Sequence, residues 1–198
     1  MFDRAFFARP AVEVAPELLG AHLVNGAVTL RITEVEAYLG VGEDPGSHSF
    51  RGRTDRNAVM FGEPGHLYTY FTYGMHVCAN VVCSPAGSAS AVLFRAGEIV
   101  AGREVASARR HTSRTADDLA RGPARLTVAL GITLADGGAD LAGGDPHLEL
   151  ATAASDYRSG PRTGVSGLGG GADYPWRFWI PGDPTVSPYK AHTPKKRP

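Results

Sequence analysis

The stretch that decides the fold is VTLRITEVEAY, residues 28–38. Apolar and polar residues alternate along its first half, which is typical of a β-strand with one buried face. Asn25 and Gly26 precede it and predict a tight hairpin turn to a shorter apolar strand at residues 22–24. The sequence therefore predicts an antiparallel strand pair near the N-terminus.

Two carboxylates interrupt the apolar pattern of this strand. Strict alternation places Glu34 and Glu36 on the face that begins with Val28, Leu30 and Ile32. A carboxylate on a continuing apolar face is costly to bury unless it has a partner or a chemical role. We therefore expect at least one of the two glutamates to serve a site.

The rest of the chain predicts more strands than helices. The most aromatic segment, residues 66–83, indicates a strand, a tight turn at Tyr73 and Gly74, and a returning strand. Other expected elements are a short helix after Pro10, a long loop at 40–65, a buried strand at 89–95, helices at 97–110 and 123–130, and a closing strand at 176–180. Together these predict a single α+β domain: a curved, mostly antiparallel sheet with peripheral helices and a protruding aromatic β-hairpin. We expect this domain to span residues 1–189, followed by a basic, flexible tail at 190–198.

Length and composition exclude several classes of protein. The chain has 198 residues, of which 43% are hydrophobic, enough for a sizeable core. It has neither an apolar run of membrane-spanning length nor a secretory signal pattern, so we expect no membrane association and a cytoplasmic protein, near the nucleoid if the source is bacterial. Cys78 and Cys83 are five positions apart in one predicted strand. This odd spacing predicts two reduced thiols on opposite faces.

The net charge of zero conceals a segregation of charge along the chain. Residues 46–125 contain ten arginines and six acidic residues, a local balance of +4, whereas residues 126–157 contain five acidic residues and no Lys or Arg. The whole-chain sum argues against a nucleic-acid partner, but the local excess is compatible with one. Composition alone leaves open a surface without function and an anion-binding surface.

Common catalytic and cofactor motifs are missing from the sequence. It has no P-loop, no serine-hydrolase elbow and no zinc-deaminase pattern, and its seven histidines do not pair as zinc ligands do. We therefore expect neither a metal nor a cofactor. All three lysines lie within residues 190–196, so a Schiff-base mechanism with a core lysine is disfavoured and chemistry through water is favoured.

A series of long motifs, in order along the chain, closely resembles the alkyladenine (3-methyladenine, N-methylpurine) DNA glycosylase family. They are TEVEAYLG (33–40), the segment 44–49, RGRTDRN (51–57), MF (60–61), PGHLYTYFTYGM (64–75), Asn80, LFRA (93–96), the segment 121–130, RTGV (162–165) and the segment 176–187. The resemblance covers nearly the whole chain. It implies an enzyme that flips a damaged purine out of double-stranded DNA and hydrolyses its N-glycosidic bond, without a cofactor and as a monomer.

The resemblance assigns catalytic roles to three residues. Glu36 matches the glutamate that activates the attacking water. Arg95 matches an arginine that helps to hold this water, together with the backbone carbonyl at the position of Thr163, where relatives more often carry an aliphatic residue. Glu34 matches no catalytic position, so we interpret it as structural.

The resemblance also implies how DNA and the damaged base are bound. Tyr38, His48 and Tyr70 match residues that stack on the base, and electron-rich rings favour a cationic methylated purine. Asn80 matches a residue that disfavours guanine. Tyr73 matches a tyrosine that intercalates in place of the flipped nucleotide. The arginines of the long loop are expected to contact DNA phosphates: Arg51, Arg53 and Arg56.

Two other functions stay open at this stage. A catalytically inactive nucleic-acid-binding module could have the same fold, although a pure binding module needs no buried carboxylate. An N-ribohydrolase acting on small molecules could share the chemistry but would need neither the intercalating residue nor the arginine-rich loop.

Overall fold

The structure is a computed structural model that describes residues 2–72 and 74–193. The α-helices are α1 (Arg4–Phe7), α2 (Ala11–Glu17), α3 (Arg103–Arg109) and α4 (Pro123–Leu130). The strands are β1 (His22–Asn25), β2 (Val28–Tyr38), β3 (Leu67–Thr72), β4 (His76–Cys83), β5 (Ser90–Ala101), β6 (His147–Glu149), β7 (Arg158–Gly160) and β8 (Arg177–Trp179). Short 3-10 helices are η1 (Asp55–Phe61), η2 (Ala116–Asp118), η3 (Leu134–Asp136) and η4 (Leu168–Gly170). No helix in the described part of the chain has the length and apolar character needed to cross a membrane.

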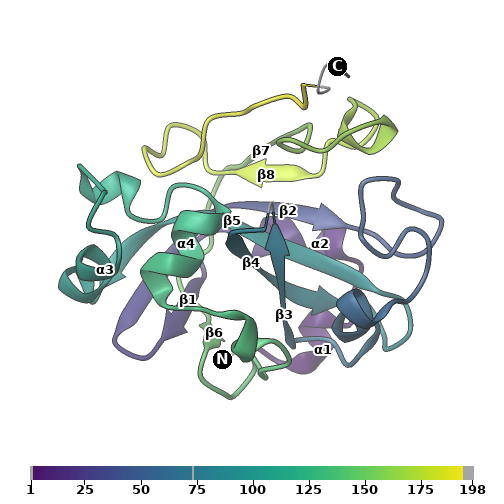
Figure 1. The fold of residues 1–198 in the computed structure, drawn as a ribbon, viewed down its shortest axis with the longest axis horizontal. Helices are drawn as coiled ribbons and strands as arrows, with labels where there is room; N and C mark the ends of the chain where they lie inside the picture. Colours follow the sequence, from purple (N-terminus) through teal and green to yellow (C-terminus); the bar gives the residue numbers. More distant parts are fainter. Residues whose placement is uncertain (1, 73, 194–198) are drawn as a thin grey trace.

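One curled sheet organises the molecule. Its antiparallel strands follow the order β3-β4-β5-β2-β1-β6, while β8 pairs with the end of β2 and with β7. Figure 1 shows α3 and α4 toward the left of this sheet, α1 and α2 toward the right, and β7 and β8 above it. The predicted single α+β domain with a curved antiparallel sheet is confirmed. β3 and β4 form the predicted strand pair, but Tyr73, the predicted turn residue, lies outside the described residues.

The prediction that side chains alternate without interruption along β2 is wrong. An irregularity in β2 and another in β5 interrupt the alternation. The register between β2 and β5 shifts on both sides of Glu34. Thr33 on β2 and Arg95 on β5 consequently have no Cα partner across this pair. An extra residue in a strand inverts the alternation of side chains beyond it. The sequence pattern gave no sign of this inversion.

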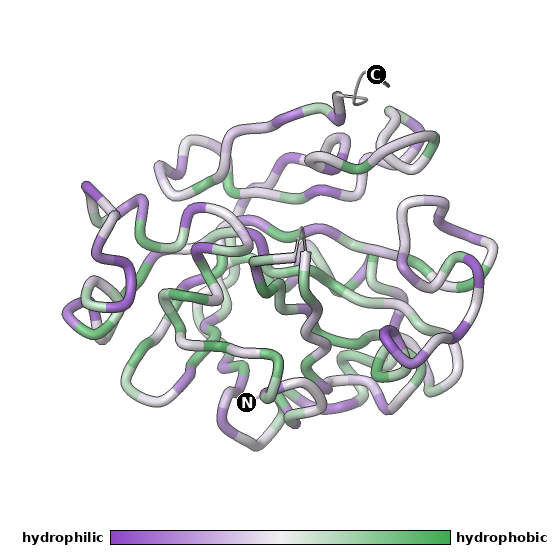
Figure 2. Tube along the Cα trace, in the orientation of Figure 1, coloured by the Kyte–Doolittle hydropathy of each residue, from purple (hydrophilic) through white to green (hydrophobic). Residues whose placement is uncertain are grey.

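The set of β2 residues in the hydrophobic core shows this inversion. On β2 the core contains Val28, Leu30 and Ile32 before the irregularity, but Val35 and Ala37 after it. The residues that alternate with the latter two, including both glutamates, therefore face the opposite side of the sheet. Figure 2 shows the hydrophobic residues gathered along the sheet and the helices packed on it, with hydrophilic residues in the outlying loops.

The predicted helix over residues 97–110 is wrong in its first half. β5 continues to Ala101, and α3 begins only at Arg103. Gly97 permits the longer strand: a Cβ at this position would lie 2.4 Å from the backbone oxygen of Arg31, so only glycine allows β2 to come this close.

Several predicted local features are confirmed. The turn at Asn25 and Gly26 joins β1 to β2, α2 follows Pro10, and α4 begins at Pro123. β8 lies within the predicted closing strand at 176–180, whereas the long loop at 40–65 contains the helix η1.

Both cysteines are free and buried, as predicted, and they face opposite sides of β4. Cys83 lies in the core, whereas Cys78 lines a cavity on the other side of the sheet. Burial raises the pKa of each thiol, so neither thiol is activated as a nucleophile.

Candidate active site

A cavity of about 320 Å³ lies on the face of the sheet that carries the two glutamates. The central strands β2, β3, β4 and β5 form its floor, and the segments 45–48 and 163–166 form its walls. Its volume is within the range usual for small-ligand sites. These four strands and two segments bring residues from distant parts of the chain together at one cavity.

Glu36 lies fully buried at this cavity, with both carboxylate oxygens bonded. Oε1 accepts a hydrogen bond from the backbone amide of Thr163 at 2.7 Å, and the Arg95 guanidinium lies 3.4 Å away. Oε2 accepts the hydroxyl of Tyr38 at 2.8 Å. A carboxylate has about four acceptor positions, so these three contacts leave room for one more donor, such as a water.

Arg95 links the two glutamates of β2. Its Nε donates to Glu34 at 2.9 Å, and its Nη2 donates to the Ser187 hydroxyl at 3.2 Å. Because Arg95 sits at the irregularity in β5, its side chain reaches the cavity side of the sheet. Burial works to lower the pKa of Arg95, but the charges of Glu36 and Glu34 raise it above its ordinary value, so Arg95 stays charged.

Glu34 has the structural surroundings that the sequence predicted. It also accepts hydrogen bonds from Arg177 Nε at 2.6 Å and from the backbone amide of Ser187 at 2.7 Å. Burial works to raise the pKa of Glu34, but the charges of Arg95 and Arg177 hold it below its ordinary value. Glu34 is therefore an ionised anchor that orients Arg95 and ties the C-terminal segment to the sheet.

Thr163 lies at the cavity, but its contact with Glu36 is one that sequence reasoning missed. The sequence singled out its carbonyl oxygen, whereas the structure shows its amide donating to Glu36. Its side-chain hydroxyl is buried without a hydrogen-bond partner among the described residues.

Aromatic rings line part of the cavity. The rings of His48 and Tyr70 pack edge to face with their centres 4.5 Å apart. The rings of Tyr68 and Tyr70 are stacked with their centres 5.6 Å apart. Tyr68 was missed among the candidates, although it belongs to the same aromatic strand; its hydroxyl lies 3.3 Å from His48 Nδ1. Burial raises the pKa of Tyr68 to about 12 and that of Tyr70 still further, so both phenols are neutral.

Three further features set the polarity of the cavity. Burial, together with the charge of Arg56, lowers the pKa of His48, so its ring is neutral near pH 7. Burial and the neighbouring Glu36 raise the pKa of Tyr38, which therefore keeps its proton. Asn80 is buried and donates to the backbone oxygen of Tyr68 at 3.0 Å, which fixes its amide at the cavity floor.

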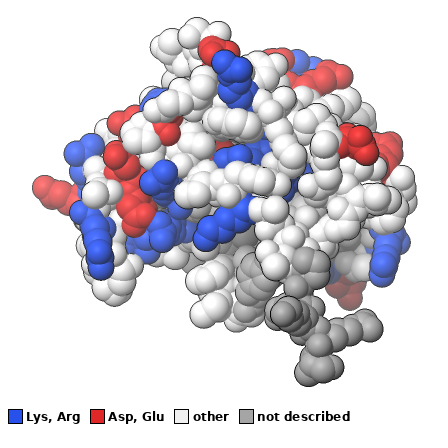
Figure 3. All heavy atoms as spheres, turned by 90° about the horizontal axis from the view of Figure 1, so that it is seen from above, with Lys and Arg blue, Asp and Glu red and all other residues white. Residues whose placement is uncertain are grey.

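The three candidate phosphate-binding arginines are all exposed. Arg56 donates to the backbone oxygen of Phe71 and lies 5.7 Å from the centre of the Tyr70 ring. Arg51 and Arg53 form no hydrogen bond or ion pair with any residue that the structure describes. Figure 3 shows basic side chains at the left and centre of one face of the molecule, with acidic side chains among them at the left.

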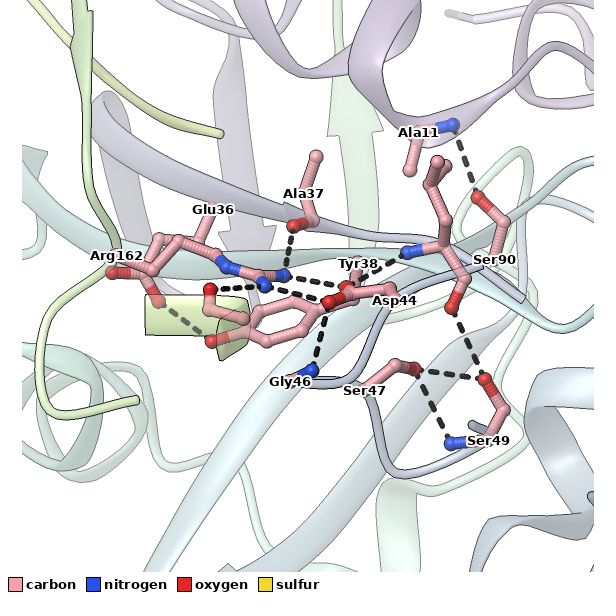
Figure 4. Close-up of polar contacts among 12 residues, drawn as sticks. Ala11, Glu36, Ala37, Tyr38, Asp44, Gly46, Ser47, Ser49, Ser90 and Arg162 are labelled. Atoms are coloured by element: carbon pink, nitrogen blue, oxygen red, sulfur yellow. Dashed lines mark hydrogen bonds and ion pairs between the residues drawn. The ribbon is translucent and has the colours of Figure 1, made fainter. Parts of the chain in front are cut away.

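A buried ion pair beside the cavity was not predicted from the sequence. Asp44 and Arg162, 118 residues apart, form two hydrogen bonds of 2.6 Å, and both side chains have zero exposure. The Arg162 guanidinium lies 4.4 Å from the centre of the Tyr38 ring. Figure 4 shows Asp44 bonded to Arg162 and, close by, Tyr38 bonded to Glu36.

Comparisons with known proteins identify the relatives of this chain. The family model described as methylpurine-DNA glycosylase matches residues 5–184. A protein of Leifsonia xyli is 62% identical over 96% of this chain and 92% of its own length, and one of Streptomyces avermitilis is 57% identical over 98% and 94%. A third, from Cutibacterium acnes, is 49% identical over 90% and 95%. All three carry the printed name "Putative 3-methyladenine DNA glycosylase".

Proposed function

Because the chain belongs to the methylpurine-DNA glycosylase family, a family of hydrolases that cleave N-glycosidic bonds in DNA, we propose that it excises alkylated and deaminated purines from duplex DNA. The proposed substrates are 3-methyladenine, 7-methylguanine, hypoxanthine and ethenoadenine. The observation that carries this proposal is Glu36, a buried carboxylate at the cavity with Arg95 beside it.

The proposed reaction is a single displacement by water. The water donates its proton to Glu36 while its oxygen forms a bond to C1′ of the deoxyribose. The bond from C1′ to the purine nitrogen breaks, and its electron pair leaves with the base. The transition state resembles an oxocarbenium ion, as in inverting glycoside hydrolysis. Arg95 and the Thr163 carbonyl are proposed to hold the water.

The cavity suits a flipped purine in both shape and charge. Methylation at ring nitrogens gives the base a positive charge, and the electron-rich faces of Tyr38 and Tyr70 stabilise such a cation. A neutral His48 adds no opposing charge. Asn80 is proposed to disfavour guanine by crowding its exocyclic amine. Tyr73 is proposed to fill the gap left in the DNA stack.

An excision assay tests the proposal. Duplexes carrying 3-methyladenine, hypoxanthine or ethenoadenine are incubated with the protein, and released base and abasic sites are measured. We expect release from at least the 3-methyladenine duplex and none from undamaged DNA. Binding without release would favour an inactive DNA-binding module, and release from free nucleosides alone would favour a small-molecule N-ribohydrolase.

Lowering the pH should weaken the binding of a cationic base through His48. Protonation of His48 adds a positive charge beside that of the methylated base. Like charges repel strongly in a site of low polarity. In the Glu36→Gln variant, which should bind without excising, we expect Kd for a 7-methylguanine duplex to rise about tenfold as the pH falls from neutral through the lowered pKa of His48. Adding His48→Phe should remove this rise. A duplex with neutral hypoxanthine is the control, and an equal pH effect on both lesions would contradict the role of His48.

The arginine-rich loop should contribute to the salt dependence of DNA binding. If Arg51, Arg53 and Arg56 each neutralise one phosphate, replacing each with alanine should reduce the slope of log K against log salt by about 0.9. Arg9→Ala is the matched control, since Arg9 is a surface arginine bonded to Glu17. Loop variants that keep the parental slope would show that the loop does not contact phosphates.

We further propose a monomer that acts in the cytoplasm on double-stranded DNA, with a catalytic domain at 1–189 and a basic tail at 190–198. The backbone oxygen of Lys190 accepts a hydrogen bond from Gly164 at 2.8 Å, so the tail begins beside the cavity wall.

A further inference from the structure

The Asp44 carboxylate joins three segments that surround the cavity. Besides the two hydrogen bonds from Arg162, it accepts the backbone amides of Leu39 at 3.2 Å and Gly46 at 2.9 Å. Leu39 follows β2, Gly46 belongs to one cavity wall, and Arg162 adjoins the other. One buried carboxylate thus fixes these segments relative to one another.

Arg162 extends these contacts to the neighbourhood of Glu36. Its guanidinium also donates to the backbone oxygens of Ala37 at 2.9 Å and Gly169 at 2.7 Å. The first bond attaches it to β2 one residue beyond Glu36. The second attaches it to the glycine-rich segment that follows the cavity wall.

Both oxygens of Glu36 accept hydrogen bonds from residues that adjoin Arg162. Oε1 accepts the amide of Thr163, the next residue in the chain after Arg162. Oε2 accepts the hydroxyl of Tyr38, whose ring lies 4.4 Å from the Arg162 guanidinium. We propose that the Asp44–Arg162 ion pair is a positioning pair that fixes the direction of the Glu36 carboxylate. This inference rests on the proposed role of Glu36 as the base.

The close approach of the backbone here supports a positioning role. A Cβ on Gly46 would lie 2.6 Å from Arg162 Nη2, and a Cβ on Gly169 would lie 2.3 Å from the Gly46 nitrogen. Glycine at both positions therefore lets two loops close around the guanidinium. A buried ion pair stabilises a fold no better than well-packed apolar residues do, so stability alone gives little reason for one at this place.

The contacts of residue 162 with Asp44 and Tyr38 require the planar guanidinium of arginine. Its planar fork can bind both oxygens of Asp44 while its flat face lies against Tyr38, and lysine can do neither. Arg162→Lys keeps the charge but should release the Thr163 amide and the Tyr38 ring from their fixed positions. Small misplacements of reacting groups reduce rates by about 100-fold.

Single-turnover excision of 3-methyladenine from duplex DNA tests the positioning role. For Arg162→Lys we expect kcat to fall about 10- to 100-fold and lesion-duplex Kd to change less than about threefold. Arg9→Lys is the matched control, because Arg9 also binds a carboxylate with two bonds, to Glu17 at 2.9 and 3.0 Å, at the surface; its kcat should not change.

A second variant pair separates positioning from a general loss of stability. Tyr38→Phe removes the bond to Glu36 Oε2 but keeps the ring. If Arg162 acts through this bond, the effects of Tyr38→Phe and Arg162→Lys on kcat should not multiply in the double variant. Multiplying effects would contradict a role of Arg162 that acts through Tyr38. Asp44→Asn replaces Arg162→Lys if thermal denaturation shows that the latter is unfolded.

The outcomes distinguish this inference from the proposed function. If the parent protein excises and Glu36→Gln does not, while a folded Arg162→Lys or Asp44→Asn keeps the parental kcat, the positioning role is overturned and the glycosylase function stands. If the parent protein does not excise any damaged purine, both fall.

Discussion

Replacing Glu36 with glutamine is expected to slow the release of 3-methyladenine from duplex DNA by about 10²- to 10⁴-fold, the usual contribution of general base catalysis. Glutamine keeps the size of the side chain but cannot take a proton from water. Its amide group must also face one of the donors that now contact the carboxylate, from Thr163, Tyr38 or Arg95. The measurement is single-turnover release of the base with protein in excess.

Binding of lesion DNA by the Glu36→Gln variant should be largely retained, because the rings and arginines proposed to hold DNA are unchanged. Glu13→Gln is the matched control, since Glu13 is an exposed glutamate on α2, remote in sequence from the cavity segments. Undiminished excision by Glu36→Gln would contradict the proposed mechanism.

Replacing Glu34 with glutamine is expected to reduce the free energy of unfolding by about 3–5 kcal/mol at neutral pH, because it removes one partner from a buried ionic cluster. Arg95 and Arg177 would each lose their charged partner on this residue while staying buried. Urea denaturation measures the loss. Glu17→Gln, in an exposed pair with Arg9, is the control and should cost about 0–1 kcal/mol.

The pH dependence of the free energy of unfolding should reflect the ionisation of Glu34 in this cluster. The pKa of Glu34 in the folded protein lies below its ordinary value of 4.5. Its contribution is therefore complete above about pH 4.5 and is lost as the pH falls through the lowered folded value. Glu34→Gln should flatten the decline of stability in this acid range. An unchanged decline would show that other carboxylates cause it.

Local sequence signals predicted the strands well, and physical chemistry explains where they failed. The alternation from Val28 to Ile32, the turn at Gly26 and the proline before α2 are local features, and each is confirmed. The irregularity at Thr33 depends on pairing with β5, some 60 residues away, and no local pattern encodes it. The burial of Glu36 was predicted correctly, but the side of the sheet that it faces was predicted wrongly.

The candidate site shows the same division between local and distant information. Resemblance to a family singled out Glu36, Arg95 and Thr163, and the structure brings all three together. The bonds between Asp44 and Arg162 join residues 118 apart, and a charged residue in a loop gives no sign of burial. Tyr68 precedes Tyr70 by two residues on β3, so strand alternation places both rings on the cavity face, a local signal that sequence reasoning missed.

The fold shows where part of the local positive charge lies. The sum over the chain is zero, but residues 46–125, with a local balance of +4, include the loop beside the cavity. Three exposed arginines there, Arg51, Arg53 and Arg56, are available to phosphates. Local charge is therefore a better guide than net charge to the proposed DNA-binding face.

The configuration at C1′ of the product tests most directly whether water displaces the base in one step with the help of Glu36. Excision is run in a single turnover with methanol added, so that methanol competes with water and the resulting methyl deoxyriboside keeps its configuration for analysis. A single displacement predicts the inverted, α-configured product. A β-configured product, or a protein–DNA adduct trapped by borohydride, would contradict the proposed mechanism.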